Sequence, residues 1–175
     1  SQRRLWVIDQ IRDGESNEYN LPVVYKVSGN FNIVAFEKAI QTLVDRHEIL
    51  RTSFITVNGE PRQFVEENYN FKLDIVECRD QNQLNELINE NAFLPFDLTV
   101  APLFRIKVIQ QSESEFVISF VMHHIISDGW SMGIMIREIF RNYALHAKNE
   151  TAEVPALNIQ YKDFSAWQNA ILNNT

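Results

Sequence analysis

The chain has 175 residues, 45% of them hydrophobic and 11% aromatic, a composition typical of one folded domain and not of a disordered chain. The formal net charge of −7, without any cluster of lysine and arginine, argues against nucleic-acid binding. The single cysteine, Cys78, excludes an internal disulfide and a multi-cysteine metal site. No apolar run reaches the ~18 residues of a membrane helix, and no apolar leader is present. We therefore expect a cytoplasmic domain, and the missing initial methionine suggests a piece of something longer.

The first half of the chain predicts helix, strand, helix, hairpin and strand in that order. Apolar residues at helical spacing predict a short helix within residues 1–11 and a longer one over residues 32–47. A β-branched and aromatic run predicts a strand at residues 21–29. Residues 51–67 read as two strands joined by Asn58-Gly59, a strong hairpin signal, and residues 70–78 alternate as a further strand.

The second half predicts a helix, two strands and two further helices in that order. Asp80 is placed to cap a helix that runs through Leu84 and Ile88. A strand begins at Leu103, and the almost continuous apolar run at 116–122 predicts a central strand covered on both faces. An amphipathic helix follows at 131–148, and a last helix runs from about 161 to 172. This order predicts a single α/β layer, an α+β sandwich with a mixed sheet packed by helices.

Two adjacent histidines end the predicted central strand, in the stretch FVMHHIISDGWSMG at residues 120–133. Because neighbouring side chains on a strand point to opposite faces, we expect His123 and His124 to do different tasks. One should be a hydrogen-bonded core histidine, and the other should face a cleft. The end of a strand is where α/β sheets place their ligands, and neutral imidazole can accept a proton near pH 7.

Asp128 follows four residues after the second histidine and directly precedes Gly129 at the predicted start of a helix. A carboxylate at that position can accept hydrogen bonds from backbone amides. If Asp128 is buried, it also needs a cation, and Arg46 and Arg51 at a helix-to-strand junction are the candidates. Breaking such a buried pair costs roughly 3–5 kcal/mol, so Asp128 could be structural and still affect activity.

Other interpretations of these residues are weaker. A metal site at His124 and Asp128 would need a third ligand, for which only His47 and His146 remain among the histidines. Ser127 lacks the Gly-x-Ser-x-Gly surroundings of a nucleophile elbow, and Cys78 reads as a plain strand-end residue. The aromatic side chains of Trp130 and Trp167 are expected to be packing anchors.

Several motifs together resemble the condensation domains of nonribosomal peptide synthetases, within the chloramphenicol acetyltransferase-like superfamily. HHIISDG at 123–129 is similar to the family's His-His-x-x-x-Asp-Gly signature. SQRRLW at 1–6, RHEILRTSF at 46–54, PFDLTVAPLFR at 95–105 and YKDFSAWQ at 161–168 resemble further family elements in the same order. They span the chain from end to end, but only the family's N-terminal lobe is represented.

The resemblance implies amide bond formation between two aminoacyl or peptidyl thioesters, both carried on the phosphopantetheine arms of upstream and downstream carrier proteins. No cofactor or metal is implied for the domain itself. His124 carries over as the key residue, either as a general base or by positioning the amine, and His123 as structural. Asp128 carries over as a salt-bridged turn residue with Arg46 or Arg51 as its partner. Gly129 lies where the substrate arm approaches the backbone.

The resemblance also implies what residues 1–175 would lack. A complete member has two lobes with the active site between them, so we expect this lobe to expose an apolar face. We expect it to be inactive without the second lobe, or to self-associate. Alternatives are an epimerisation domain of the same superfamily, a noncatalytic module that docks carrier proteins, and an unrelated metal-binding domain.

Overall fold

The computed structural model describes residues 2–12, 16–150 and 154–173, and in that part of the chain no helix is long and apolar enough to cross a membrane. Its centre is a four-stranded sheet in the order β1 (Asn20–Ser28), β6 (Glu115–His123), β5 (Phe104–Gln110) and β4 (Asp74–Glu77). Neighbouring strands are antiparallel except β4 and β5, which are parallel. The predicted mixed sheet is confirmed.

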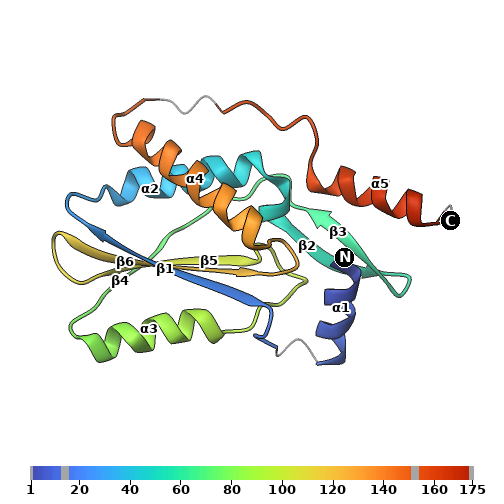
Figure 1. Ribbon diagram of the computed structural model, residues 1–175, viewed down its shortest axis with the longest axis horizontal. Coiled ribbons are helices and arrows are strands. Elements are labelled where there is room, and N and C mark those ends of the chain that lie inside the picture. Colours follow the sequence, from blue (N-terminus) through green and yellow to red (C-terminus); the bar gives the residue numbers. More distant parts are fainter. Residues whose placement is uncertain (1, 13–15, 151–153, 174–175) are drawn as a thin grey trace.

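Helices cover both faces of this sheet (Figure 1). The helices α2 (Ile33–Arg46) and α4 (Gly129–His146) lie on one face and α3 (Gln81–Phe93) on the other. Consequently every residue of the central strand β6 after Glu115 is buried, as the apolar run predicted. The predicted cap of α3 is also present, because Asp80 accepts hydrogen bonds from the backbone amides of Asn82 and Gln83.

The remaining elements lie at one end of the layered body (Figure 1). They are α1 (Gln2–Ile11), the short 3-10 helix η1 (Glu48–Arg51), the hairpin β2 (Thr52–Val57) and β3 (Glu60–Val65), and α5 (Tyr161–Asn173). The hairpin turn is the predicted Asn58-Gly59 pair, with φ of 53° and 79°. Both residues take the left-handed conformation that a tight hairpin turn requires, which is why asparagine and glycine suit it.

One predicted strand is shorter than expected. Residues 70–73 are irregular, and β4 begins only at Asp74. The backbone amides of Phe71 and Leu73 donate to side chains of α2, to Gln41 at 2.7 Å and to Glu37 at 2.9 Å. Because these amides are satisfied by the helix, this segment has no need of a strand partner.

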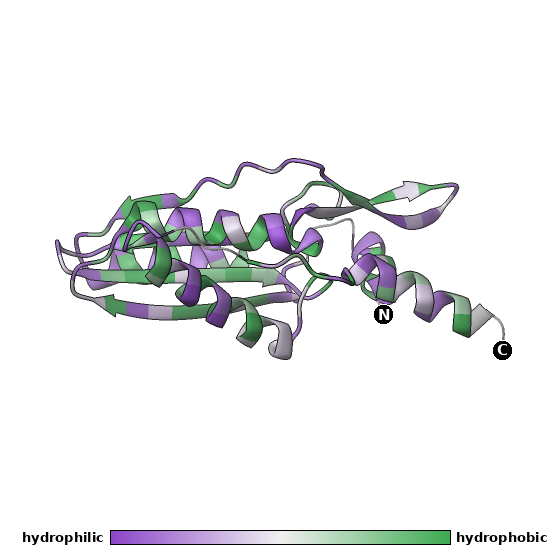
Figure 2. Cartoon of the chain, turned by 90° about the horizontal axis from the view of Figure 1, so that it is seen from above, coloured by the Kyte–Doolittle hydropathy of each residue, from purple (hydrophilic) through white to green (hydrophobic). Residues whose placement is uncertain are grey.

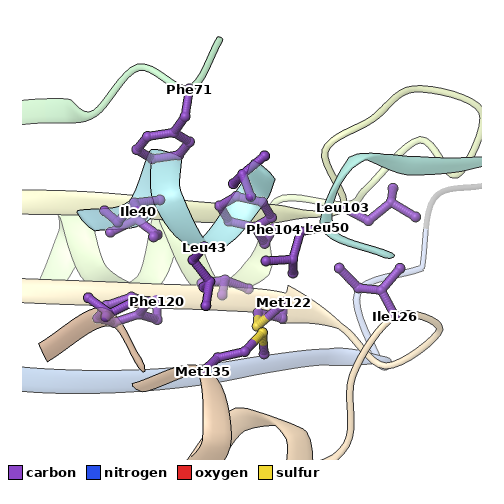
Figure 3. Packing of buried hydrophobic residues seen from close by; sticks show 14 of the residues in the cluster. Ile40, Leu43, Leu50, Phe71, Leu103, Phe104, Phe120, Met122, Ile126 and Met135 are labelled. Atoms are coloured by element: carbon purple, nitrogen blue, oxygen red, sulfur yellow. The ribbon is translucent and has the colours of Figure 1, made fainter. Parts of the chain in front are cut away.

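A contiguous hydrophobic core fills the space between the sheet and the helices α2 and α4. Figure 3 shows side chains of α2, β5, β6 and α4 meeting there, among them Ile40, Phe104, Met122 and Met135. These residues come from all parts of the sequence, and each is less than a tenth exposed. The core fixes the direction of β6, and therefore the position of the two histidines at its end.

Candidate active site

His123 ends β6 inside the core, with 1% of its surface exposed. Its Nδ1 accepts a hydrogen bond from the backbone amide of Ile125 at 3.1 Å, and the rings of Tyr19 and Phe96 lie with centroids 6.1 Å from its own. Burial, and secondarily the charge of His124, lowers the pKa of His123 to about 4. The ring is therefore neutral near pH 7, and the predicted core histidine is confirmed.

His124 points to the opposite side of the strand and is exposed. Its Nδ1 lies 2.6 Å from the carbonyl oxygen of Ser127, and its backbone amide donates to the carbonyl of Tyr19 at 2.8 Å. Since a carbonyl oxygen can only accept, Nδ1 carries a proton, and in the neutral ring Nε2 then holds a free lone pair. Nε2 has no partner among the described residues, so it is available as a base or hydrogen-bond acceptor.

A cavity of about 420 Å³ lies beside His124. Its volume is within the range of small-molecule sites. Isoleucine, leucine and methionine side chains form much of its wall. The polar part comes from elements that are far apart in the sequence, and includes His47, His124, Asp128, Ser131, Gln160 and Tyr161.

Asp128 is the N-cap residue of α4 and is exposed. Its carboxylate accepts hydrogen bonds from the backbone amide of Ser131 at 2.8 Å and from the Ser131 hydroxyl at 2.6 Å. The hydroxyl bond, followed by the amide bond, lowers the pKa of Asp128 below its ordinary value. The predicted capping of backbone amides is confirmed, and it holds the start of α4 beside the cavity.

The ion pair predicted between Asp128 and an arginine was wrong. Arg46 binds Glu138 on α4 instead, and its Nε donates to the carbonyl of Pro155 at 3.1 Å. Arg51 donates to the backbone carbonyl of Glu66 and lies 3.9 Å from the carboxylate of Glu48. Asp128 needs no cation because its charge remains in water, where a surface pair contributes little.

The arginine and histidine of the RHEILR segment form a cluster with one partly buried acid of α4. Glu138 binds Arg46 through one carboxylate oxygen and His47 Nε2 through the other, at 2.8 Å for the histidine. Burial alone would raise the pKa of Glu138, but the hydrogen bonds and charges of Arg46 and His47 lower it, so the group is ionised. The sequence signal was the position of Glu138, three residues after Met135 and directly before Ile139, both of them buried on α4.

Arg105 stacks on the ring of Phe96, which in turn packs against His123. The guanidinium carbon of Arg105 lies 3.8 Å from the Phe96 ring centroid. Its nitrogens donate to the carbonyls of Asn91, Leu94 and Pro95 at 3.0, 2.6 and 3.3 Å. Burial lowers the pKa of Arg105 to about 10, so it stays charged near pH 7. A cation–π contact therefore fixes the loop behind the buried histidine.

Gly129 is the first residue of α4, and neither its backbone nor its neighbours require a glycine. It does not have a positive φ, and a Cβ built on it would meet no atom of the described chain within 4 Å. The space in front of this backbone is therefore open on the side where α4 begins.

The side chains of Cys78 and Ser127 are buried and hydrogen-bonded to backbone carbonyls. Cys78 is a buried free thiol whose Sγ donates to the carbonyl of Asp80 at 3.0 Å. Ser127 is buried, and its hydroxyl donates to the carbonyl of Asp128 at 3.3 Å. Over the described residues, no group of three or more His, Cys, Asp or Glu side chains is arranged to hold a metal ion.

Large aromatic side chains are exposed near the cavity and on α5. Trp130 and Trp167 are 79% and 60% exposed, so the expectation that they are packing anchors was wrong for the described chain. Tyr161 and Phe164 on α5 are 41% and 43% exposed. Figure 2 shows hydrophobic residues interspersed along this helix, which lies at the end of the molecule. Apolar side chains of α5 are thus open to solvent in the described chain.

The family model of the condensation domain matches residues 1–175. This chain belongs to the condensation-domain family. Among related proteins, this condensation domain is 42% identical over 168 residues to bacitracin synthase 3 of Bacillus licheniformis and 38% identical over 169 residues to gramicidin S synthase 2 of Brevibacillus brevis. These alignments cover 96% and 97% of this chain but 2% and 4% of the relatives.

Solved structures agree with the fold. The condensation domain matches the X-domain from teicoplanin biosynthesis, solved in complex with OxyB, at 26% identity and a TM-score of 0.90. It matches the starter condensation domain of rhizomide synthetase RzmA at 21% identity and a TM-score of 0.78. These matches cover 98% and 87% of this chain but 37% and 38% of the solved chains. The chain therefore spans less than two fifths of the length of these neighbours.

Proposed function

We propose that this condensation domain forms amide bonds between two carrier-bound aminoacyl or peptidyl thioesters, and that His124 is its catalytic residue. The observation that carries the proposal is the state of the His124 ring. Nδ1–H is held by the Ser127 carbonyl, and Nε2 is free at the edge of a cavity of about 420 Å³. A ring fixed in this tautomer is prepared to accept a hydrogen from a substrate amine.

In the reaction, the amine nitrogen forms a bond to the thioester carbon, and the bond from that carbon to sulfur breaks. The nitrogen loses a proton, and the leaving thiolate gains one. An α-amine with a pKa of ~8 is already partly neutral at pH 7, so His124 need not remove a proton before attack. Its Nε2 can instead orient the amine and receive the proton that the attack releases. Holding two tethered reactants together supplies much of the remaining acceleration.

The open space at Gly129 supports the entry of a substrate arm on this side. No neighbouring atom of the described chain lies within 4 Å of the place where a Cβ of Gly129 would be. The phosphopantetheine arms that deliver both substrates would belong to carrier proteins, not to this domain. Arg46 and Asp128 contribute by holding α4 in place, and Arg51 by tying η1 to Glu66 at the end of the β2–β3 hairpin.

The proposal includes a second lobe. The exposed face of α5, with Tyr161, Phe164 and Trp167, is where we place its contact, because apolar surface of this kind is covered in stable proteins. Residues 1–175 alone should then be inactive, because only part of the cavity wall would be present. Self-association through the same face is the alternative way to cover it.

The test combines residues 1–175 with the second lobe of a condensation domain, as one chain or as two, and with two loaded carrier proteins. Intact mass spectrometry follows the appearance of the dipeptidyl carrier. We expect product only with both lobes, and a fall of about 100-fold or more for His124→Ala. His146→Ala, a histidine outside the cavity, serves as the matched control and should keep its rate. Equal product from His124→Ala would contradict the catalytic role.

A second candidate function is docking without catalysis. It is favoured by the match to the teicoplanin X-domain, whose solved complex contains another protein, OxyB. This candidate predicts that carrier proteins or other partners bind equally well to the native chain and to His124→Ala, with no product from either. An epimerisation activity of the same site would instead move an α-proton, and would be detected as exchange of that proton with deuterated solvent.

A further inference from the structure

A second imidazole, that of His47, lies on the wall of the same cavity as His124. It comes from the end of α2, 77 residues earlier in the chain, so sequence gives no reason to associate the two rings. The His47 side chain is 17% exposed, which leaves part of the ring open.

The neighbours of His47 determine which of its nitrogens is open. Nε2 lies 2.8 Å from Oε2 of Glu138, whose other oxygen binds Arg46. Since an ionised carboxylate can only accept, Nε2 carries a proton, and in the neutral imidazole Nδ1 then holds a lone pair. Nδ1 has no hydrogen-bond partner in the part of the chain that is described. His47 thus repeats the state of His124, where a carbonyl holds one ring nitrogen and the other is free.

A purely structural histidine at this position would need only the bond to Glu138. His146 is an example of a structural histidine between α2 and α4: its Nε2 lies 3.1 Å from the hydroxyl of Thr42 on α2. That histidine does not line the cavity. Furthermore, Arg46 alone already pairs the charge of Glu138, so a second donor is not required to stabilise the acid.

We propose that His47 is a second substrate-contacting residue, whose Nδ1 accepts a hydrogen bond from the α-amine of the aminoacyl substrate and holds that amine in the cavity. The proposal rests on the proposed function, in which the amine reacts beside His124. An ammonium or amine nitrogen carries more than one hydrogen, and two imidazole acceptors on one cavity can bind two of them. Glu138 acts through His47 as a positioning residue, because it selects the tautomer and orients the ring.

Two substitutions separate this role from a structural one. In His47→Gln the amide nitrogen can reach the position of Nε2 and keep the bond to Glu138, but no acceptor remains at Nδ1. In His47→Asn the side-chain oxygen can take the place of Nδ1, but the bond to Glu138 is lost. A substrate contact therefore predicts the larger defect for glutamine, and a structural bond predicts the larger defect for asparagine.

The kinetic experiment uses a synthetase that contains this chain with its second lobe, and it varies the concentration of the amine-bearing carrier. We expect His47→Gln to raise the KM for that carrier about tenfold, the effect of one hydrogen bond to a charged group, and His47→Asn to raise it less. His146→Gln should leave it unchanged. Equal effects of the two His47 variants, a larger effect of asparagine, or no effect of glutamine would each overturn the proposal. Activity of His124→Ala at the native rate would contradict the proposed function instead.

A spectroscopic measurement on residues 1–175 tests the same idea without turnover. Nitrogen-15 NMR should show His47 protonated at Nε2 and His124 protonated at Nδ1. Glycinamide, used as a small α-amine probe, should shift the His47 Nδ1 resonance, with no shift for His146. A proton found on His47 Nδ1, or shifts of equal size at His47 and His146, would overturn the proposal.

Discussion

The position of Asp128 leads to a quantitative prediction about stability. Its carboxylate accepts two hydrogen bonds from Ser131 and caps α4, while its charge lies in water. Replacing an N-cap aspartate by alanine typically costs about 1 kcal/mol, with a range of about 0.5–2. For a chain of this length that corresponds to a fall in Tm of about 2–4 °C. Breaking a buried ion pair would cost roughly 3–5 kcal/mol instead.

The measurement is urea unfolding followed by circular dichroism for Asp128→Ala and for Asp80→Ala. Asp80 caps α3 through two backbone amides at 2.9 and 3.0 Å and lies away from the cavity, so it is the matched control. We expect both variants to lose about 1 kcal/mol with an unchanged denaturant slope, and only Asp128→Ala to slow peptide formation. Asp128→Asn keeps an acceptor and should be close to native. A loss above about 3 kcal/mol for Asp128→Ala, with about 1 for Asp80→Ala, would refute the capping argument.

Three further predictions concern burial. Asn142 is fully buried, and neither polar atom of its side chain has a partner among the described residues, so Asn142→Leu should raise Tm by a few degrees. The control Asn91→Leu removes two hydrogen bonds and should lower Tm. Burial holds the pKa of His123 at about 4 in the folded chain, below its ordinary 6.5. Between these two values the unfolded chain binds a proton that the folded chain does not, so the free energy of unfolding falls by up to about 1.4 kcal/mol for each pH unit from 6.5 down to 4. The urea midpoint should therefore fall less between pH 7 and pH 5 for His123→Asn than for the native chain, and an equal fall in both would contradict this argument. Acrylamide quenching of Trp130 and Trp167 should weaken when the second lobe is added; unchanged quenching would place the lobe contact elsewhere.

Local patterns predicted most of the fold because each depends on a few neighbouring residues. The Asn58-Gly59 turn, the Asp80 cap and the opposite directions of His123 and His124 follow from backbone geometry alone. The segment at 70–73 departs from its alternating pattern because α2 supplies acceptors for its amides. That information is not present in the segment itself.

The candidate site was predictable only in part, because its electrostatics depend on which helices meet. Arg46 and Glu138 are 92 residues apart, and only the packing of α2 against α4 brings them together. The choice of Asp128 as the partner of an arginine failed because the turn leaves that carboxylate in water. The exposure of Trp130 could not be deduced either, because its burial depends on which elements pack around it and not on its neighbours in the sequence.

The attachment of α5 determines how a movement of this helix would reach the cavity. None of its described side chains is buried, and polar bonds link its start to η1 and the end of α2: Gln160 accepts from the Glu48 amide and donates to the Arg46 carbonyl, and Lys162 pairs with Glu48. These anchors flank His47. Each such bond contributes about 1 kcal/mol, far less than a packed core. Because these bonds end at Arg46 and Glu48, on either side of His47, a displacement of α5 would reach the cavity wall through residues 46–48.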